Sequence, residues 1–220
     1  MAYIDLVSEV HKATKRDYIG RVNSADKAEC ATVAKKYGFD YWDGDRKYGY
    51  GGYHYDGRWR PVAQKIADYY GLKAGDKVLD VGCGKAYLLY ELTQVVPGLI
   101  VKGIDISEYG IEHAKEEIKD ELSIARAQEL PYGDNEFDLV ISLTTLHNLK
   151  IYDLVKAVKE IERVSKKNSY IMVESFRNDE EEVNMLYWQL TCASYYSVDE
   201  WEWIYEQCGY TGDYSFIFFE

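Results

Sequence analysis

The sequence contains little proline or cysteine, few positive charges, and no long apolar run. Its 220 residues include three prolines and four cysteines. No stretch approaches the roughly 18 apolar residues of a membrane-spanning helix, and no apolar segment follows a basic N-terminus. We therefore expect no signal peptide, no membrane-spanning helix and no membrane partner.

The four cysteines are Cys30, Cys83, Cys192 and Cys208, and they form no Cys-x-x-Cys pair. This spacing indicates neither a zinc site nor a redox motif, and it makes a disulfide framework unexpected. We expect a protein without a metal ion, in a reducing cytoplasm.

Positive charge is outnumbered, with 26 basic against 38 acidic residues and a formal net charge of −12. Proteins that hold nucleic-acid phosphates usually carry a dense basic face. The charge therefore argues against a nucleic-acid partner and favours a small-molecule substrate.

Tyrosine is abundant instead, with 22 residues, many between Tyr41 and Tyr55 and in the last forty positions. Tyrosine suits half-buried packing, but it also suits a pocket lined by rings with polar tips. Both interpretations stay open. The C-terminal aromatic residues are also compatible with a homodimer.

Two parts of the chain differ in character, and we expect a boundary between residues 1–58 and 59–220. The first part reads as two helices, Tyr3–Arg16 and Ser24–Tyr37, followed by a Gly/Tyr/Asp-rich segment, Gly38–Arg58. In the second part, apolar strands alternate with amphipathic helices, and this order predicts a mostly parallel sheet covered on both faces. The expected strands are Val78–Val81, Leu99–Ile104, Leu122–Ala125, Phe137–Leu143, Tyr170–Glu174 and Tyr214–Phe219.

A glycine turn follows the first of these strands. Asp80 precedes Gly82 and Gly84, and Asp105 ends the second strand. Glycines let a ligand approach the backbone closely, and the following helix start offers free N–H groups. A carboxylate at Asp105 can accept from both hydroxyls of a ribose. Tyr87 stands where a dinucleotide fold needs its third glycine, which disfavours an NAD(P)-linked oxidoreductase.

With these motifs the sequence resembles the class I S-adenosylmethionine (SAM) dependent methyltransferases. The matching segments are VLDVGCGKAYLLYEL, GIDIS and ELPYGDNEFDLVISLTTLHNL, and the resemblance covers residues 59–220. It implies a Rossmann-like sheet of seven strands with an antiparallel last strand. It also implies methyl transfer from SAM, leaving S-adenosylhomocysteine. A SAM- or nucleoside-binding regulatory protein without catalysis is the alternative.

The resemblance also implies roles for individual residues. Asp80 and the glycine loop would border the methionine part, Asp105 the ribose, and Ile106 the adenine. The cofactor-binding residues expected in this way are Asp80, Gly82, Cys83, Gly84, Asp105, Ile106, Ala127, Gln128, Ser142 and Leu143.

The candidate base is His147, which lies in the segment that follows the fourth strand. An unperturbed histidine side chain titrates near neutral pH. The alternative is that His147 only packs beneath a helix. Glu174 ends the fifth strand and Arg177 follows it, so both are candidates for the acceptor pocket.

The segment before the core, residues 41–59, combines glycines with tyrosines and arginines, as expected of a lid that closes over the methyl acceptor. We expect a small polar acceptor: a sugar, a nucleotide sugar or a carboxylated amine. O- and N-methylation are not separable at this point. The substrate candidates are Tyr48, Tyr50, Tyr53, His54, Tyr55, Arg58, Glu174 and Arg177.

Overall fold

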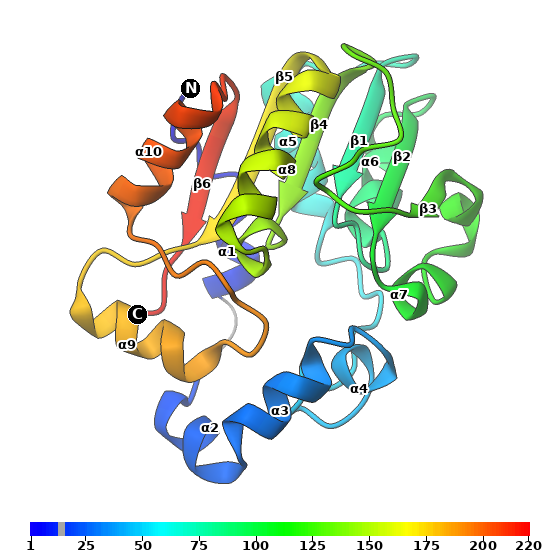
Figure 1. Ribbon diagram of the computed structural model, residues 1–220. Helices are drawn as coiled ribbons and strands as arrows, with labels where there is room; N and C mark the ends of the chain where they lie inside the picture. The colour runs from blue at the N-terminus through cyan, green and yellow to red at the C-terminus, as the bar shows by residue number, and fades with distance from the viewer. Residues whose placement is uncertain (13–15) are drawn as a thin grey trace.

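The computed structural model describes residues 1–12 and 16–220. At its centre is a six-stranded parallel sheet with the order β3-β2-β1-β4-β5-β6 (Figure 1). The order reverses beside β1, so the carboxyl ends of β1 and β4 flank the point where ligands of such sheets bind. The strands are β1 (Lys77–Val81), β2 (Ile100–Asp105), β3 (Leu122–Ile124), β4 (Phe137–Leu143), β5 (Ser165–Glu174) and β6 (Asp213–Ile217).

Helices cover both faces of the sheet, as expected. In Figure 1, α8 (Ile151–Val164) and α10 (Val198–Cys208) lie on the front face, and α5 (Arg60–Tyr70) and α6 (Tyr87–Val95) lie on the rear face. The apolar residues of α8 repeat at helical spacing and are buried in the core cluster with residues of β4 and β5, which removes their apolar surface from water. The shorter elements are α7 (Glu108–Glu112), η1 (Glu116–Glu121), η2 (Leu146–Asn148) and α9 (Asp179–Trp188).

The expectation of seven strands with an antiparallel last strand is wrong for the described residues, which contain six strands. β6 pairs with β5 in parallel, from Tyr170 opposite Asp213 to Glu174 opposite Ile217. The cause is the connection, because α10 crosses over before the chain turns at left-handed Gly209. The outer edge of β6 bonds to the N-terminal segment, where Tyr3 forms a parallel bridge with Tyr214.

The N-terminal part contains short helices in place of the two long ones expected. They are α1 (Ser8–Lys12), α2 (Tyr18–Ser24), α3 (Lys27–Ala34) and α4 (Phe39–Trp42). Asp26 accepts a backbone N–H bond as an N-cap, so α3 begins at Lys27, inside the second expected helix. Asp17 caps α2 in the same way, and α2 occupies the interval between the two expected helices. Residues 13–15 of the first expected helix lie outside the described residues.

The N-terminal helices lie below the carboxyl ends of the strands (Figure 1). Leu6 and Val7 join the rear core, and Cys30 and Ala34 pack against Leu190, so this part contacts the sheet region directly. None of the helices in the described part of the chain is long and apolar enough to cross a membrane.

Candidate functional site

The glycine loop after β1 has a backbone that side chains would obstruct. Gly82 has φ +88°, and a Cβ there would lie 2.0 Å from Thr145 Oγ1. Gly84 has φ +55°, and a Cβ there would lie 2.7 Å from the Trp42 ring. Ala86, in place of a third glycine, also takes a left-handed conformation, at φ 56°. The glycine loop therefore forms a narrow cradle, in which a ligand can contact the backbone because no side chain stands between them.

Asp105 lies beside this cradle at the end of β2. One of its oxygens accepts the Gly84 N–H and the other accepts the Ser107 N–H, both at 2.8 Å. Burial raises the pKa of Asp105, and these backbone bonds oppose the rise. The carboxylate keeps further acceptor capacity toward a cavity of about 180 Å³.

That cavity has the composition expected for a nucleoside. Its wall includes Asp105 and Ile106 from one side, and Ala127, Gln128 and Leu149 from the other. A single carboxylate among apolar and amide groups suits a ribose joined to a flat apolar base.

Asp80 borders a smaller cavity of about 60 Å³ with Gly82, Cys83 and Leu143. Its side chain is buried, and one carboxylate oxygen has no hydrogen-bond partner. Burial, together with the charge of Asp105, raises the pKa of Asp80 to about 8. An unpartnered buried carboxyl of this kind is suited to receive a cationic group. Ser142 differs, because it is fully buried and donates to Val81 O at 2.8 Å, bracing the two strands.

α4 and the residues that follow it are held over the glycine loop by hydrogen bonds and an ion pair. Trp42 Nε1 donates to Ser107 Oγ at 2.8 Å. Asp43 forms an ion pair with Lys85 of the loop at 2.7 Å and accepts from Tyr109 OH at 2.8 Å. Burial acts to raise the pKa of Asp43, but the bonds from Lys85 and Tyr109 hold it below its ordinary value. We call residues 38–59 the lid segment.

Tyr50 of the lid segment lies at the junction of the cavities. Its ring stacks on Trp42 at 5.3 Å between centroids and contacts Tyr53 at 4.6 Å. Tyr50 and Thr144 each line the two cofactor-side cavities and a third one. Thr144 follows β4 with φ 54°, an unusual value for a β-branched residue, and such strain is often found at functional positions.

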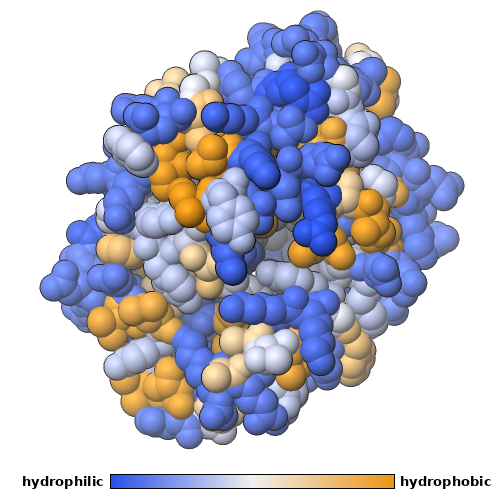
Figure 2. Space-filling view, viewed as in Figure 1, coloured by the Kyte–Doolittle hydropathy of each residue, from blue (hydrophilic) through white to orange (hydrophobic). Residues whose placement is uncertain are grey.

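The third cavity has a volume of about 290 Å³ and opens between the sheet and the helices below it. Figure 2 shows the surface hollowed in this region, with hydrophilic side chains over most of the face. Of the expected substrate residues, those that line it are Tyr50, Tyr53, His54, Arg58 and Glu174, and the candidate base His147 lines it as well. We call it the acceptor cavity.

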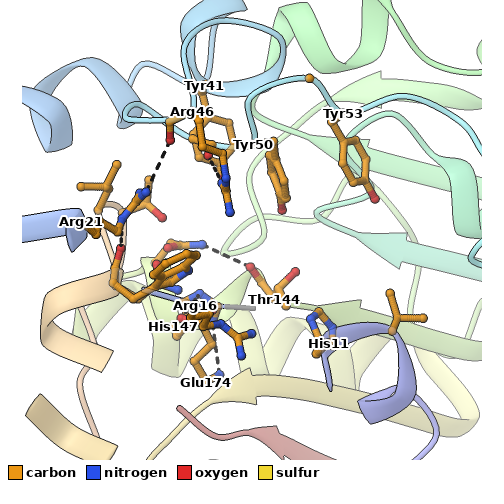
Figure 3. Close-up of a pocket in the computed structure, with 18 of the residues that line it drawn as sticks. His11, Arg16, Arg21, Tyr41, Arg46, Tyr50, Tyr53, Thr144, His147 and Glu174 are labelled. Atoms are coloured by element: carbon orange, nitrogen blue, oxygen red, sulfur yellow. Dashed lines mark hydrogen bonds and ion pairs between the residues drawn. The ribbon is translucent and has the colours of Figure 1, made fainter. Parts of the chain in front are cut away.

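His147 and Glu174 face each other at the bottom of the acceptor cavity (Figure 3). His147 Nε2 lies 3.3 Å from Glu174 Oε2, and Nδ1 accepts the Glu174 backbone N–H at 3.4 Å. Because Nδ1 accepts, the neutral ring carries its proton on Nε2, toward the carboxyl. Burial lowers the pKa of His147 to about 3 and raises that of Glu174 to about 8.

Three substrate candidates lie elsewhere. Tyr48 packs in the small cluster around Cys30, and Tyr55 donates to Glu91 at 2.5 Å. Arg177 pairs with Glu181 and Glu220 beside the outer sheet edge. Arg58 lines the acceptor cavity but is paired with Asp56 at 2.6 Å.

Several residues of the acceptor cavity carry no local sequence signal. They come from the segment before α2, from α2 itself, from the residue after β4, from η2 and from the end of α9: Arg16, Arg21, Thr144, Asn148 and Trp188. Arg46 also lines this cavity, and it belongs to the arginine-containing segment 41–59 that was expected to form the lid. A cluster of basic residues spread over the N-terminal part was the only trace that could have pointed to them.

A family model described as a methyltransferase domain matches residues 72–209. The chain belongs to the SAM-dependent methyltransferase family. Among solved structures, the YcgJ protein of Bacillus subtilis is similar with a TM-score of 0.56 at 21% identity, covering 66% of each chain. A SAM-dependent methyltransferase of Methanosarcina mazei has a TM-score of 0.54 at 21% identity over 65% of this chain and 82% of that one. At these identities the likeness supports the fold, and membership of the family implies SAM as the cofactor.

Relatives within this methyltransferase family differ in what their names say they act on. A 27-O-demethylrifamycin SV methyltransferase of Amycolatopsis mediterranei is 35% identical over 40% of this chain and 35% of its own length. A demethylmenaquinone methyltransferase of Bacillus cytotoxicus is 37% identical over 49% of this chain and 46% of its own. A tRNA (carboxymethyluridine(34)-5-O)-methyltransferase of Arabidopsis thaliana is 30% identical over 66% and 34%. The chain thus spans a third to a half of these relatives.

Proposed function

We propose that the protein transfers the methyl group of SAM to a small polar acceptor bound in the acceptor cavity. One observation carries the proposal: the glycine cradle and the acceptor cavity meet at a shared wall made by Tyr50 and Thr144. Methyl transfer from a sulfonium is a direct displacement, so alignment and exclusion of water are the main tasks of the protein.

On the cofactor side, we assign Asp105 to the ribose hydroxyls and the unpartnered oxygen of Asp80 to the ammonium of the methionine part. The wall that carries Ile106, Ala127 and Gln128 would receive the adenine, and Cys83 and Leu143 would border the small cavity. SAM supplies the electrophilic methyl group when bound.

On the acceptor side, we assign Glu174 as the group that takes a proton from the acceptor, with His147 as its positioning residue. His147 offers no free lone pair toward the cavity in the geometry described, whereas the raised pKa of Glu174 suits a base near neutral pH. Candidate acceptors remain a sugar, a nucleotide sugar or a carboxylated amine, methylated on oxygen or nitrogen.

We further propose that residues 1–58 form the cap that completes this site on the core of residues 59–220. The cap would contribute the lid segment and the N-terminal wall of the acceptor cavity. A cavity of this size suits a small-molecule acceptor, and a cytoplasmic location and a homodimer stay proposals.

Titration calorimetry with SAM, S-adenosylhomocysteine and NADH tests the proposed function. We expect both adenosyl compounds to bind and NADH not to bind, because the helix after the glycine loop carries Tyr87 where a dinucleotide fold requires glycine. Absence of SAM binding by the folded protein would refute the proposal.

Trypsin digestion tests the fastening of the lid segment. Asp43→Asn removes one charge of the buried pair with Lys85, so cleavage after Arg46, Lys47 and Arg58 should become several-fold faster. Addition of SAM should slow it again. The exposed Asp45→Asn is the matched control, and it should digest like the original chain. Equal rates for all three proteins would show that the ion pair does not hold the lid.

A further inference from the structure

Three guanidinium groups surround one tryptophan at the end of α9. The centres of Arg21, Arg46 and Arg16 lie 4.7, 5.4 and 5.9 Å from the centroid of the Trp188 ring. The arginines come from separate places in the N-terminal part, and all four residues line the acceptor cavity. In Figure 3, Arg46 lies above the cavity, Arg21 at its left, and Arg16 below, beside His147. We call them the arginine cluster.

Carboxylates do not balance the arginine cluster. Within the described ranges, Arg58, Arg60, Arg163 and Arg177 each form an ion pair with an acidic side chain, whereas none of the three cluster members does. The Arg16 Nε is buried without a hydrogen-bond partner. The N–H groups that have no partner therefore belong to arginine side chains that line the acceptor cavity.

Arg21 and Arg46 use only part of their hydrogen-bonding capacity within the protein. Arg21 Nε donates to Trp188 O at 2.8 Å, which fixes its ring contact at the C-terminus of α9. Arg46 donates to Gly49 O within the lid segment. Each guanidinium has five N–H groups, so most of them remain available to a ligand.

The positive charges within the arginine cluster oppose one another. Burial, and then the charge of Arg46, lowers the pKa of Arg21. Burial also lowers the pKa of Arg46, with the charge of Arg16 adding to the effect. Gathering three cations in one partly buried place is unfavourable unless an anion offsets it. Glu174 is the carboxyl on the cavity floor, and the charge of Arg16 lowers its pKa against the larger effect of burial. Its charged-group contact is with His147, and among the described residues it forms no ion pair with the three arginines.

We propose that Arg16, Arg21 and Arg46 bind an oxyanion of the methyl acceptor, a phosphate or carboxylate group, against the face of Trp188. This inference rests on the proposed function and narrows it, because the acceptor is then anionic. Planar guanidinium groups match the paired oxygens of such groups, and the ring contacts hold the groups in orientation. The anion anchors one end of the acceptor, and the reacting atom lies toward Thr144 and Glu174.

Calorimetry at low salt tests this site. It measures the binding of pyrophosphate, inorganic phosphate and malonate to the full chain. We expect pyrophosphate to bind, and Arg21→Gln and Arg46→Gln to weaken it by at least roughly tenfold each. Arg21→Lys keeps the charge but loses the fork, so it should give an intermediate loss. Lys159→Gln removes the same charge from an exposed position on α8 and should stay within about twofold of the original affinity.

The outcomes separate this inference from the proposed function. The anion site is overturned if pyrophosphate, phosphate and malonate all fail to bind. It is also overturned if an anion that binds the original chain binds Arg21→Gln and Arg46→Gln equally well. SAM binding is measured on the same samples and should be unchanged in these variants. If SAM fails to bind the original chain while pyrophosphate binds through the cluster, the anion site stands and the methyltransferase proposal falls. Tighter binding of malonate than of phosphate assigns the oxyanion to a carboxylate, and the reverse assigns it to a phosphate.

Discussion

Glu174→Gln should slow methyl transfer by at least roughly 100-fold while making the fold more stable, with the acceptor identified beforehand. Turnover falls because the amide cannot take a proton from the acceptor. Shape and burial are nearly preserved, so SAM binding should not change. Steady-state kinetics with the exposed Glu180→Gln as control provides the comparison. Full turnover in Glu174→Gln would remove the carboxyl from the chemistry.

The stability gain follows from the sign of the pKa change. The pKa of Glu174 rises from 4.5 to about 8 on folding, because burial disfavours the charged form. Between these values the native state holds a proton that the unfolded chain has lost, so stability falls as the pH rises through this window. At pH 7 the penalty is on the order of 3 kcal/mol. Urea unfolding at pH 5 and pH 7 should therefore show a smaller pH effect in Glu174→Gln.

Asp105→Ala should weaken SAM binding by at least roughly tenfold, since the ribose loses its acceptor and the Gly84 N–H loses its partner. Calorimetry with SAM and with adenosine measures this loss, and adenosine isolates the ribose contact because it lacks the methionine part. Asp120→Ala, at an exposed position in η1, is the matched control. Unchanged affinity for both ligands would exclude Asp105 from the site.

Much of the sheet could be predicted because each strand and helix has a characteristic pattern of apolar residues within its own short segment. Buried strands such as β4 are continuous apolar runs, and the helix that follows repeats its apolar residues at 3.6 positions. The direction of β6 could not be obtained in this way, since pairing depends on the crossover and on neighbours distant in sequence. The resemblance to the family supplied an antiparallel strand that the described chain does not contain. In the N-terminal part, Asp26 caps α3 inside the second expected helix, and α2, capped by Asp17, lies where no helix was expected.

The residues of the site can also be divided into those that a local motif predicts and those that only the folded structure brings together. Asp80, Gly82, Gly84 and Asp105 could be named because they lie at or just beyond the carboxyl ends of β1 and β2, within one short sequence motif each. Arg46 lies in the segment whose arginines were expected to face the acceptor, but its gathering with Arg16, Arg21 and Trp188 could not be predicted, since parts of the chain distant in sequence must first fold together. The role of His147 changed for a similar reason: only the structure places a backbone N–H against Nδ1 and a carboxyl against Nε2.

The wall made by Tyr50 and Thr144 has a thermodynamic consequence. Because the same two residues border the cofactor and acceptor sides, a ligand on either side orders the surface that the other must contact. The second ligand then meets a wall whose conformational entropy has already been lost, so it binds more tightly. Such coupling is reciprocal, and acceptor and cofactor therefore raise each other's affinity by the same factor. We therefore expect the two compartments to behave as one cooperative unit, linked through Tyr50 and Thr144.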